Sequence, residues 1–253
     1  MKFSRSILPG RLLYVALALG LQVCLGQGTL KSGVSKWSPA NHTALTGSTT
    51  FFDVFEMTVV TLKAGKKQNR VVPPDYEEAI ILKEGKLEIT VNGETQTLGP
   101  GSTAFFIPRE NYTYSSIESE PVVFFELKFK SNKTADEPRA KTNGGSFVVD
   151  WNSIEMKKSE KGGRRDFFNR ATATCQKFEM HVTTLNEGLP SHAPHTHAEE
   201  EVILMIKGDA TMEIAGKYYS AAPGDFIFVA SNELHGLKNT GKGQCEYFAF
   251  QWK

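Results

Sequence analysis

An internal repeat constrains the fold of this chain more than any other feature of its sequence. The tripeptide Phe55-Glu56-Met57 recurs as Phe178-Glu179-Met180, a displacement of 123 residues. The same displacement relates Glu77-Glu78 to Glu200-Glu201, Gly85 to Gly208, Gly93 to Gly216, Pro100-Gly101 to Pro223-Gly224, Phe105 to Phe228 and Phe125 to Phe248. Because no insertion interrupts this register and turn residues fall on turn residues, we predict two copies of one fold.

Each copy has the pattern of an all-β domain. The chain shows little helical periodicity and many short alternating or apolar runs separated by Gly, Pro and Asn, as is typical of a β-sandwich or a β-barrel. Asn92-Gly93 and its counterpart Ala215-Gly216 indicate hairpin turns, because Asn-Gly favours positive φ angles. In the second copy we predict strands over residues 174–185, 201–207, 210–214, 218–220, 226–230 and 245–252.

The first 26 residues have the pattern of a secretory signal peptide. Basic residues precede an apolar run over residues 12–25, and the small residue Gly26 ends the segment. The run is shorter than the roughly 18 residues that a membrane-spanning helix needs. We therefore predict cleavage of residues 1–26, a secreted or periplasmic protein, and no membrane contact after cleavage. The chain has 29 basic and 28 acidic residues, and this balance gives no reason to expect a nucleic-acid partner.

The rest of the chain divides into two domains and a connection. Residues 27–130 are the predicted N-terminal domain, residues 131–145 a linker, and residues 146–253 the C-terminal domain. The linker has few apolar residues and is expected to be exposed. Residues 157–165 carry five basic side chains and are expected to form a solvated surface loop rather than an anion site.

Two cysteines remain after the signal peptide. Cys175 and Cys245 fall near the starts of two separate predicted strands. Antiparallel pairing of those strands would place the two residues at opposite ends, so we expect two buried free thiols rather than a disulfide.

Three side chains that can bind a metal occur within seven residues of the second copy. His195, His197 and Glu201 lie at the start of an apolar run over residues 202–206, which is predicted to be a buried strand. On an extended strand residues two apart point the same way, so both imidazoles and the carboxylate would share one face. Glu200 would lie on the opposite face.

A further imidazole follows a later strand of the same copy. His235 comes after the predicted strand over residues 226–230 and can complete the site. Three neutral imidazoles and one carboxylate suit one transition metal ion, with Mn, Fe, Co, Ni, Cu and Zn all acceptable. Such a set leaves coordination positions open for water or substrate, which implies chemistry.

These residues resemble the two motifs of the cupin superfamily. The first motif appears as Gly188, His195-Thr196-His197, Glu201 and Gly208, and the second as His235 and Asn239. The chain has six rather than five residues between Gly188 and His195, and Ala230-Ser231-Asn232 where the family usually has a turn with Pro and Gly. Together with the repeat, the resemblance implies a bicupin, in which two jelly-roll β-barrels lie in tandem and each has a candidate pocket at its centre.

The first copy keeps the framework but lacks the ligands. The displacement of 123 residues places Val72, Pro74 and Tyr112 at the positions of His195, His197 and His235. The carboxylate survives as Glu78, but one carboxylate cannot hold a transition metal ion. We therefore predict one metal ion per chain, in the C-terminal barrel. Tyrosines such as Tyr112 are expected to fill the first barrel or line a small apolar site.

No catalytic residue can be assigned from the sequence, and His181 and His192 are the two candidates. His181 alternates with apolar neighbours on a predicted strand, so it can face the barrel and contact substrate or pack into the wall. His192 is expected at the pocket mouth, with a fifth ligand or a proton shuttle as the alternative. Arg164, Arg165 and Arg170 could reach an anionic substrate.

Two classes of function fit these residues. The resemblance favours a metal-dependent enzyme of dioxygenase, decarboxylase or isomerase type that acts on a small oxygen-rich molecule such as a sugar, a hydroxy acid or a carboxylate. The alternative is a non-catalytic protein that binds or senses a carbohydrate or metabolite, because the fold alone does not imply turnover. A ureidoglycine aminohydrolase is similar in length, but its ligand order differs from the order here. A small-molecule substrate is the expected partner, and a homodimer is possible.

Overall fold

The computed structural model describes residues 28–253, and β-strands make up most of its regular structure. The predicted signal peptide, residues 1–26, lies outside the described residues. Within the described part of the chain, no helix is both long enough and apolar enough to cross a membrane.

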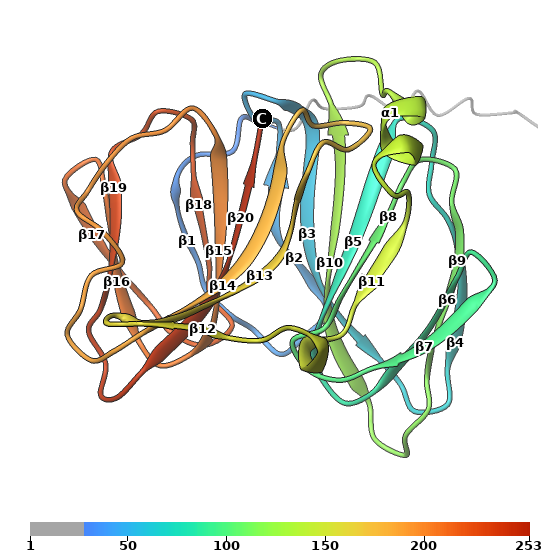
Figure 1. Ribbon diagram of the computed structural model, residues 1–253, viewed down its shortest axis with the longest axis horizontal. Coiled ribbons are helices and arrows are strands. Elements are labelled where there is room, and N and C mark those ends of the chain that lie inside the picture. Colours follow the sequence, from blue (N-terminus) through green and yellow to red (C-terminus); the bar gives the residue numbers. More distant parts are fainter. Residues whose placement is uncertain (1–27) are drawn as a thin grey trace, which may run out of the picture.

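The elements follow the order expected of a repeated unit (Figure 1). The first half contains β1 (Gly33–Ser35), β2 (His42–Gly47), β3 (Phe52–Leu62), β4 (Lys67–Val71), β5 (Tyr76–Glu84), β6 (Leu87–Val91), β7 (Glu94–Leu98), β8 (Thr103–Phe106), β9 (Asn111–Ser116) and β10 (Val122–Ser131). The helix α1 (Glu137–Thr142) follows. The second half contains β11 (Phe147–Val149), the 3-10 helix η1 (Trp151–Ser153), β12 (Lys157–Ser159), β13 (Gly162–Arg170), β14 (Phe178–Leu185), β15 (Glu200–Lys207), β16 (Ala210–Ile214), β17 (Lys217–Ala221), β18 (Phe226–Val229), β19 (His235–Asn239) and β20 (Cys245–Trp252).

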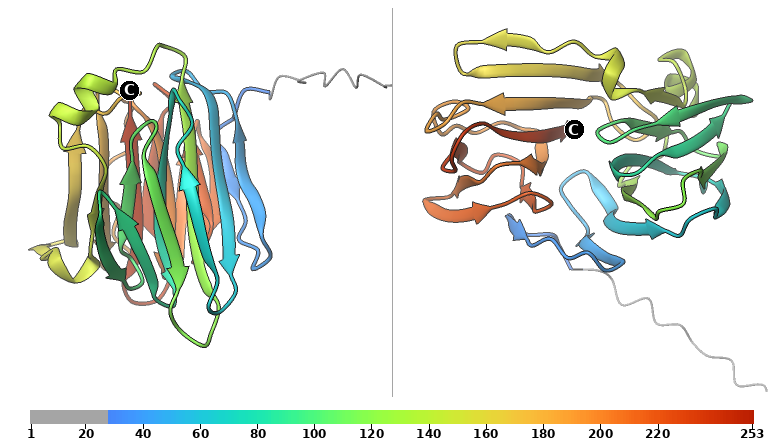
Figure 2. Two further views of the ribbon diagram at one scale, coloured as in Figure 1. Left: turned by 90° about the vertical axis from the view of Figure 1, so that its right-hand side faces the viewer. Right: turned by 90° about the horizontal axis from the view of Figure 1, so that it is seen from below.

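Four antiparallel sheets form two jelly-roll barrels, which confirms the predicted tandem arrangement. The first barrel has a six-stranded sheet in the order β11-β8-β5-β10-β3-β2 and a four-stranded sheet in the order β4-β9-β6-β7. The second barrel has a seven-stranded sheet in the order β1-β18-β15-β20-β14-β13-β12 and a three-stranded sheet in the order β17-β16-β19. The two large sheets lie side by side at the centre of the molecule, and the small sheets lie outside them (Figures 1 and 2).

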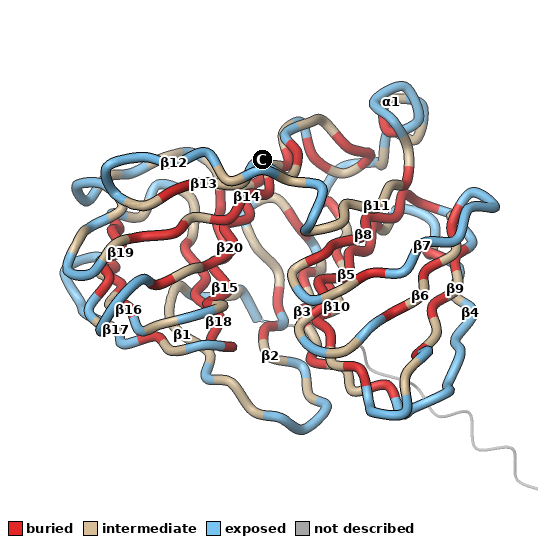
Figure 3. Tube along the Cα trace, turned by 60° about the horizontal axis from the view of Figure 1, so that its bottom comes forward, coloured by how far each residue is buried: buried red, intermediate tan, exposed pale blue. Residues whose placement is uncertain are grey.

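The central strands β5, β8, β15 and β18 of the large sheets are buried on both faces (Figure 3). In β15, Val202 and Leu204 pack into the core between the barrels, whereas Ile203 and Met205 pack into the interior of the second barrel. A strand with two buried faces reads as a continuous apolar run. Aromatic rings fill the core between the barrels, where Trp252 lies 5.4 Å from Phe52 between ring centroids. The two barrels therefore share one hydrophobic interface.

The barrels also exchange a strand, which the predicted division into residues 27–130 and 146–253 did not include. Strand β1 pairs with β18 of the second barrel, and β11 pairs with β8 of the first barrel. Each exchanged strand begins an arm of similar sequence, Ser32 to Trp37 and Ser146 to Trp151. These arms are displaced by 114 residues rather than 123, so a search at one constant displacement does not detect them.

Both arms make the same contacts on the barrel that receives them. The hydroxyl of Ser146 donates to Glu110 at 2.7 Å and accepts from the backbone of Ile107 at 3.1 Å. The hydroxyl of Ser32 donates to Glu233 and accepts from the backbone of Ala230. Glu110 and Glu233 are repeat partners, and each anchors one of the two arms.

Two expected loops have regular structure instead. The predicted linker contains α1, whose Asp136 accepts a hydrogen bond from the backbone of Arg139 at its N-terminus. Residues 157–165 were expected to form a loop but contain β12 and the start of β13, which form a hairpin. Strand β12 of this hairpin is an edge strand of the seven-stranded sheet, where exposed charged side chains hinder pairing with other chains.

The other strand predictions agree with the structure within a few residues. The predicted strand over 174–185 begins only at Phe178, and β19 was not predicted. Asn92 and Ala215 have φ angles of 54° and 48°, as the predicted hairpin turns require. Cys175 and Cys245 are free and buried, which confirms that expectation.

Candidate metal centre

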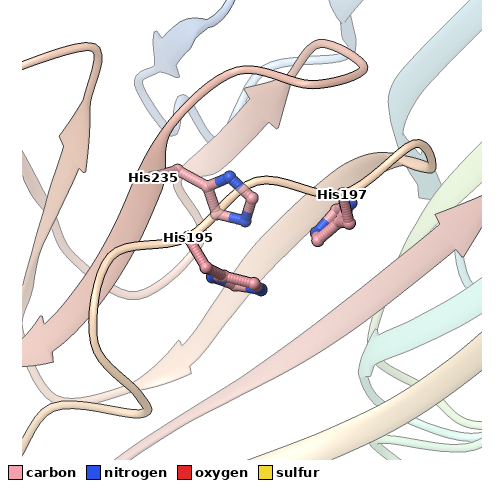
Figure 4. A group of neighbouring side chains, drawn as sticks. All are labelled: His195, His197 and His235. Atoms are coloured by element: carbon pink, nitrogen blue, oxygen red, sulfur yellow. The ribbon is translucent and has the colours of Figure 1, made fainter.

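The four predicted ligands come from three segments of the second barrel. His195 and His197 lie in the loop between β14 and β15, Glu201 lies in β15, and His235 is the first residue of β19. The prediction that His195, His197 and Glu201 share one extended strand is therefore wrong for the two histidines. The side chains converge nevertheless, as Figure 4 shows for the three imidazoles.

Backbone hydrogen bonds align the histidine loop with β19. The backbone N–H of His195 donates to the carbonyl of His235 at 3.0 Å, and the N–H of His235 donates to the carbonyl of His195 at 3.0 Å. The buried side chain of Asn239 donates to the carbonyls of Leu185 and Gly243 at 3.0 and 2.8 Å. The side chain of the second motif's Asn therefore links the end of β14 to the loop between β19 and β20 and is not itself a ligand candidate.

The three imidazoles and the carboxylate form one compact cluster. One ring nitrogen from each of His195, His197 and His235 lies within 4.8 Å of the others. The Oε2 atom of Glu201 lies 3.3 Å from Nε2 of His235 and 3.8 Å from Nε2 of His197. Glu200 points away from the cluster and accepts hydrogen bonds from Thr50 and Trp252, as the strand alternation predicted.

The hydrogen bonds of two histidines leave their Nε2 atoms free to bind a metal. Nδ1 of His197 lies 2.9 Å from the carbonyl of Glu199, and Nδ1 of His235 lies 2.8 Å from the carbonyl of Glu233. A carbonyl can only accept, so in each ring the proton lies on Nδ1 and the lone pair on Nε2. Within residues 28–253, Nε2 of His197 and Nε2 of His235 are buried without a hydrogen-bond partner, as is Nδ1 of His195.

The ionisation of the cluster suits cation binding. Burial alone would raise the pKa of Glu201, but its interactions with the nearby imidazoles of His197 and His235 outweigh burial and lower that pKa below its ordinary value. Burial and the imidazoles of His192 and His235 lower the pKa of His195, so its neutral form is favoured. Glu201 in turn raises the pKa of His197 against the effect of burial, so metal binding must displace a proton wherever that ring is charged. The anionic carboxylate and the neutral His195 are already in the forms that metals bind.

The cluster opens into a cavity of about 290 Å³ inside the second barrel. Both candidate catalytic histidines line it: His181 from the wall strand β14, and His192 from the loop, 4.0 Å from His195 between ring centroids. Of the three arginines considered, only Arg164 is among the lining residues. The other polar residues of the lining include Glu179, Thr183, Ser191, Tyr247 and Gln251.

Sequence reasoning missed Glu179 and Gln251. The strand register places Glu179, Gln251 and Glu201 next to one another across β14, β20 and β15, and the amide of Gln251 donates to Glu201 at 3.2 Å. Glu179 lies two residues before His181, so strand alternation could have placed both on the cavity face. No pattern in the sequence relates Gln251 to Glu201, because their pairing depends on the register of β15 with β20.

Comparison with protein families identifies the fold. A model of the cupin domain matches residues 58–128 and 181–250. The chain belongs to the cupin family. Because the two matches fall on the two barrels, this protein is a bicupin. A comparison with curated proteins found no match.

Solved structures of low sequence identity share the bicupin fold. The protein Ylba from E. coli is 16% identical, with a TM-score of 0.62 over 91% of this chain and 86% of that one. A variant of the oxalate decarboxylase OxdC from Bacillus subtilis is 14% identical, with a TM-score of 0.64 over 88% and 78%. Salicylate 1,2-dioxygenase from Pseudaminobacter salicylatoxidans is 11% identical, with a TM-score of 0.58 over 78% and 70%.

Proposed function

We propose that the second barrel binds one transition metal ion through His195, His197, Glu201 and His235 and acts on a small oxygen-rich carboxylate or hydroxy acid. The observation that carries this proposal is the convergence of three buried imidazole nitrogen atoms without hydrogen-bond partners. Leaving buried polar atoms unpaired costs free energy, and a bound cation removes that cost. Mn, Fe, Co, Ni, Cu and Zn all accept this donor set.

The residues present fit such an ion. The carbonyls of Glu199 and Glu233 orient the imidazoles of His197 and His235, as hydrogen-bond partners of metal-binding histidines commonly do. Gln251 orients the Glu201 carboxylate by donating to Oε1. When bound, the metal would supply a Lewis acid that polarises substrate oxygen atoms.

The charges of the cavity favour a substrate that is an anion. The ionised side chains in its lining are Arg164, Glu179 and Glu201, which carry one positive and two negative charges. A divalent ion turns this balance into one net positive charge, and complementary charge favours a singly charged carboxylate. Thr183, Ser191 and Tyr247 offer hydroxyl groups that can bind further substrate oxygen atoms.

The fold comparisons support a reaction of decarboxylase or dioxygenase type, with isomerase chemistry as a third possibility. Oxalate decarboxylase and salicylate dioxygenase are named as enzymes that act on small carboxylates, and both share this fold. At 11–14% identity these comparisons establish the shared fold, and both the reaction type and the substrate class are part of our proposal. A binding or sensing protein without turnover is the alternative outcome.

Metal analysis combined with a turnover screen tests the proposal. We expect about one transition ion per purified chain, and loss of this ion in His195→Ala and His235→Ala. His42→Ala is the matched control, since His42 lies on β2 of the first barrel. Two ions per chain, or one ion that survives both substitutions, would refute the assignment.

Turnover is then measured on the metal-loaded protein with small carboxylates and hydroxy acids, in the presence and absence of oxygen. Product that forms with the wild-type chain and not with His197→Ala supports an enzyme. Saturable binding of the same compounds without product supports the binding protein instead. Secretion and a homodimer remain predictions, which secretion assays of the full chain and sedimentation of the purified protein can test.

A further inference from the structure

A second polar group lies in the same cavity, two strands away from Glu201. Glu179 and His181 project from β14, and the register of β14, β20 and β15 separates Glu179 from Glu201 by one intervening strand. Two strand spacings correspond to roughly 10 Å. Glu179 and His181 both line the cavity, so a small molecule bound at the histidine cluster would lie within reach of these two side chains.

Cationic and polar groups surround the Glu179 carboxylate. Nη2 of Arg164 lies 2.5 Å from Oε1, and Nδ1 of His181 lies 3.2 Å from the same oxygen. Nζ of Lys177 and Nδ2 of Asn169 lie 3.3 and 3.2 Å from Oε2. The interactions of Glu179 with His181 and Arg164 lower its pKa to about 2, although burial acts in the opposite direction. The carboxylate is therefore an anion at neutral pH.

The Glu179 carboxylate lies close to Nδ1 of His181, which is buried and makes no hydrogen bond within the described residues. A carboxylate near Nδ1 favours the tautomer with its proton on Nδ1, which leaves the lone pair on Nε2. The ring itself is 7% exposed and lies on the cavity wall. An imidazole that has a carboxylate 3.2 Å from one nitrogen and the other nitrogen available can act as an acid–base group.

We propose that His181 is the proton-transfer residue of this cavity and that Glu179 is its positioning residue. The proposal deepens the proposed function and depends on it for the nature of the substrate. The proton leaves an O–H or C–H group of the substrate and adds to Nε2 of His181, while the electron pair of the broken bond stays on the substrate. Return of this proton to the product restores the neutral ring.

The repeat provides an internal comparison. The first barrel, which lacks the histidine cluster, has Glu56 at the position of Glu179 but Thr58 at the position of His181. The carboxylate therefore occurs in both copies, whereas the imidazole occurs only beside the cluster. A wall residue that served packing alone would not need to differ in this way.

Nitrogen NMR of the full chain, labelled with ¹⁵N-histidine and loaded with Zn²⁺, tests the tautomer directly. Comparison with His181→Asn assigns the resonances of His181. We expect a protonated Nδ1 and an unprotonated Nε2 at pH 8. Glu179→Ala should shift the ring toward protonation on Nε2, and Glu179→Gln, which keeps an acceptor oxygen, should restore the Nδ1–H form. Protonation of Nε2 in the wild-type chain would overturn the proposal.

Chemical modification tests whether the lone pair faces the cavity. Diethyl pyrocarbonate acylates unprotonated imidazole nitrogen, and mass spectrometry locates the products. We expect modification of His181 within the time that labels the exposed His192, and no modification of the three cluster histidines while Zn²⁺ is bound. An unmodified His181 beside a labelled His192 contradicts the proposal. Labelling of His195, His197 and His235 despite added Zn²⁺ would instead contradict the metal site, so the two failures are distinguishable.

Discussion

The hydroxyl of Tyr112 donates a 2.7 Å hydrogen bond to the carboxylate of Glu78 inside the first barrel. These residues occupy the positions that His235 and Glu201 hold in the second barrel. Nη2 of Arg70 lies 3.6 Å from Glu78 and supplies a positive charge. The first barrel thus satisfies its buried carboxylate with protein groups alone, as expected of a copy that lacks the ligands.

Tyr112→Phe should destabilise the protein by about 1–3 kcal/mol, because the buried Glu78 loses a donor that water cannot replace. Urea unfolding measures this loss of free energy. Tyr114→Phe is the control, since the hydroxyl of Tyr114 is not one of the donors to Glu78 among the described contacts. Equal stability of the wild-type chain and Tyr112→Phe would show that this hydrogen bond contributes nothing.

Glu201→Gln and Glu200→Gln should affect different properties, the first metal binding and the second stability. Glu201 faces the imidazole cluster, so its substitution is expected to weaken metal binding by about 100-fold or more. Glu200 accepts from the backbone of Thr50 and the indole of Trp252 between the barrels. Its substitution should leave metal affinity unchanged and lower stability by about 1–2 kcal/mol.

Competition with a chromogenic chelator measures metal affinity for this pair, and urea unfolding of the metal-free proteins measures stability. A similar loss of metal affinity in both variants would argue against Glu201 as a specific ligand.

The contribution of Glu179 to the free energy of unfolding should depend on pH. The pKa of Glu179 is about 2 in the folded chain, against an ordinary value of 4.5. A lowered folded pKa means that the stabilisation is fully present above about pH 4.5 and is lost as the pH falls toward 2. After allowance for solvent screening, we expect Glu179→Gln to be about 2 kcal/mol less stable than the wild-type chain at pH 7.

Urea unfolding of both chains at pH 7, 5, 4 and 3 checks this expectation. The difference in unfolding free energy should stay constant between pH 7 and 5 and then shrink. A difference that grows on acidification would contradict the lowered pKa.

Gly224→Ala should destabilise the protein more than Gly216→Ala does. Both glycines have positive φ angles, 92° and 75°, so each substitution strains the backbone by about 1 kcal/mol. A Cβ atom on Gly224 would also lie 2.7 Å from Cγ of Trp37 in the exchanged arm, whereas Gly216 has open space. Thermal unfolding of both variants measures the difference. Equal melting temperatures would mean that Trp37 moves to accommodate the added Cβ atom without loss of stability.

Much of this fold was predictable because the sequence pattern of each turn and strand occurs twice in the chain. Glycines and apolar runs that recur at one displacement identify turns and strands, and the structure confirms the hairpins at Asn92 and Ala215. The arms that begin at Ser32 and Ser146 escaped detection because their displacement differs from that of the barrels. Strands of three residues carry too little periodicity to be recognised on their own.

The composition of the candidate site was also predictable, but its geometry was not. Imidazoles close together in sequence indicated a metal, and the three of them converge as expected. His195 reaches the site from a loop that pairs with His235 rather than from the strand of Glu201. The ion pair of Arg164 with Glu179 depends on the hairpin over residues 157–170, where the charges had indicated a solvated loop.

The sequence by itself determined that this protein has two copies of a β-barrel and that only the second carries the imidazoles, because residue type and spacing are properties of the chain. The tertiary structure decided which polar groups face one another across the cavity and which barrel each arm joins. Those outcomes depend on strand register and on the packing of two sheets, in which residues fifty or more positions apart become neighbours. Local patterns cannot encode them, since a shift of one residue in register turns every side chain of a strand to its other face.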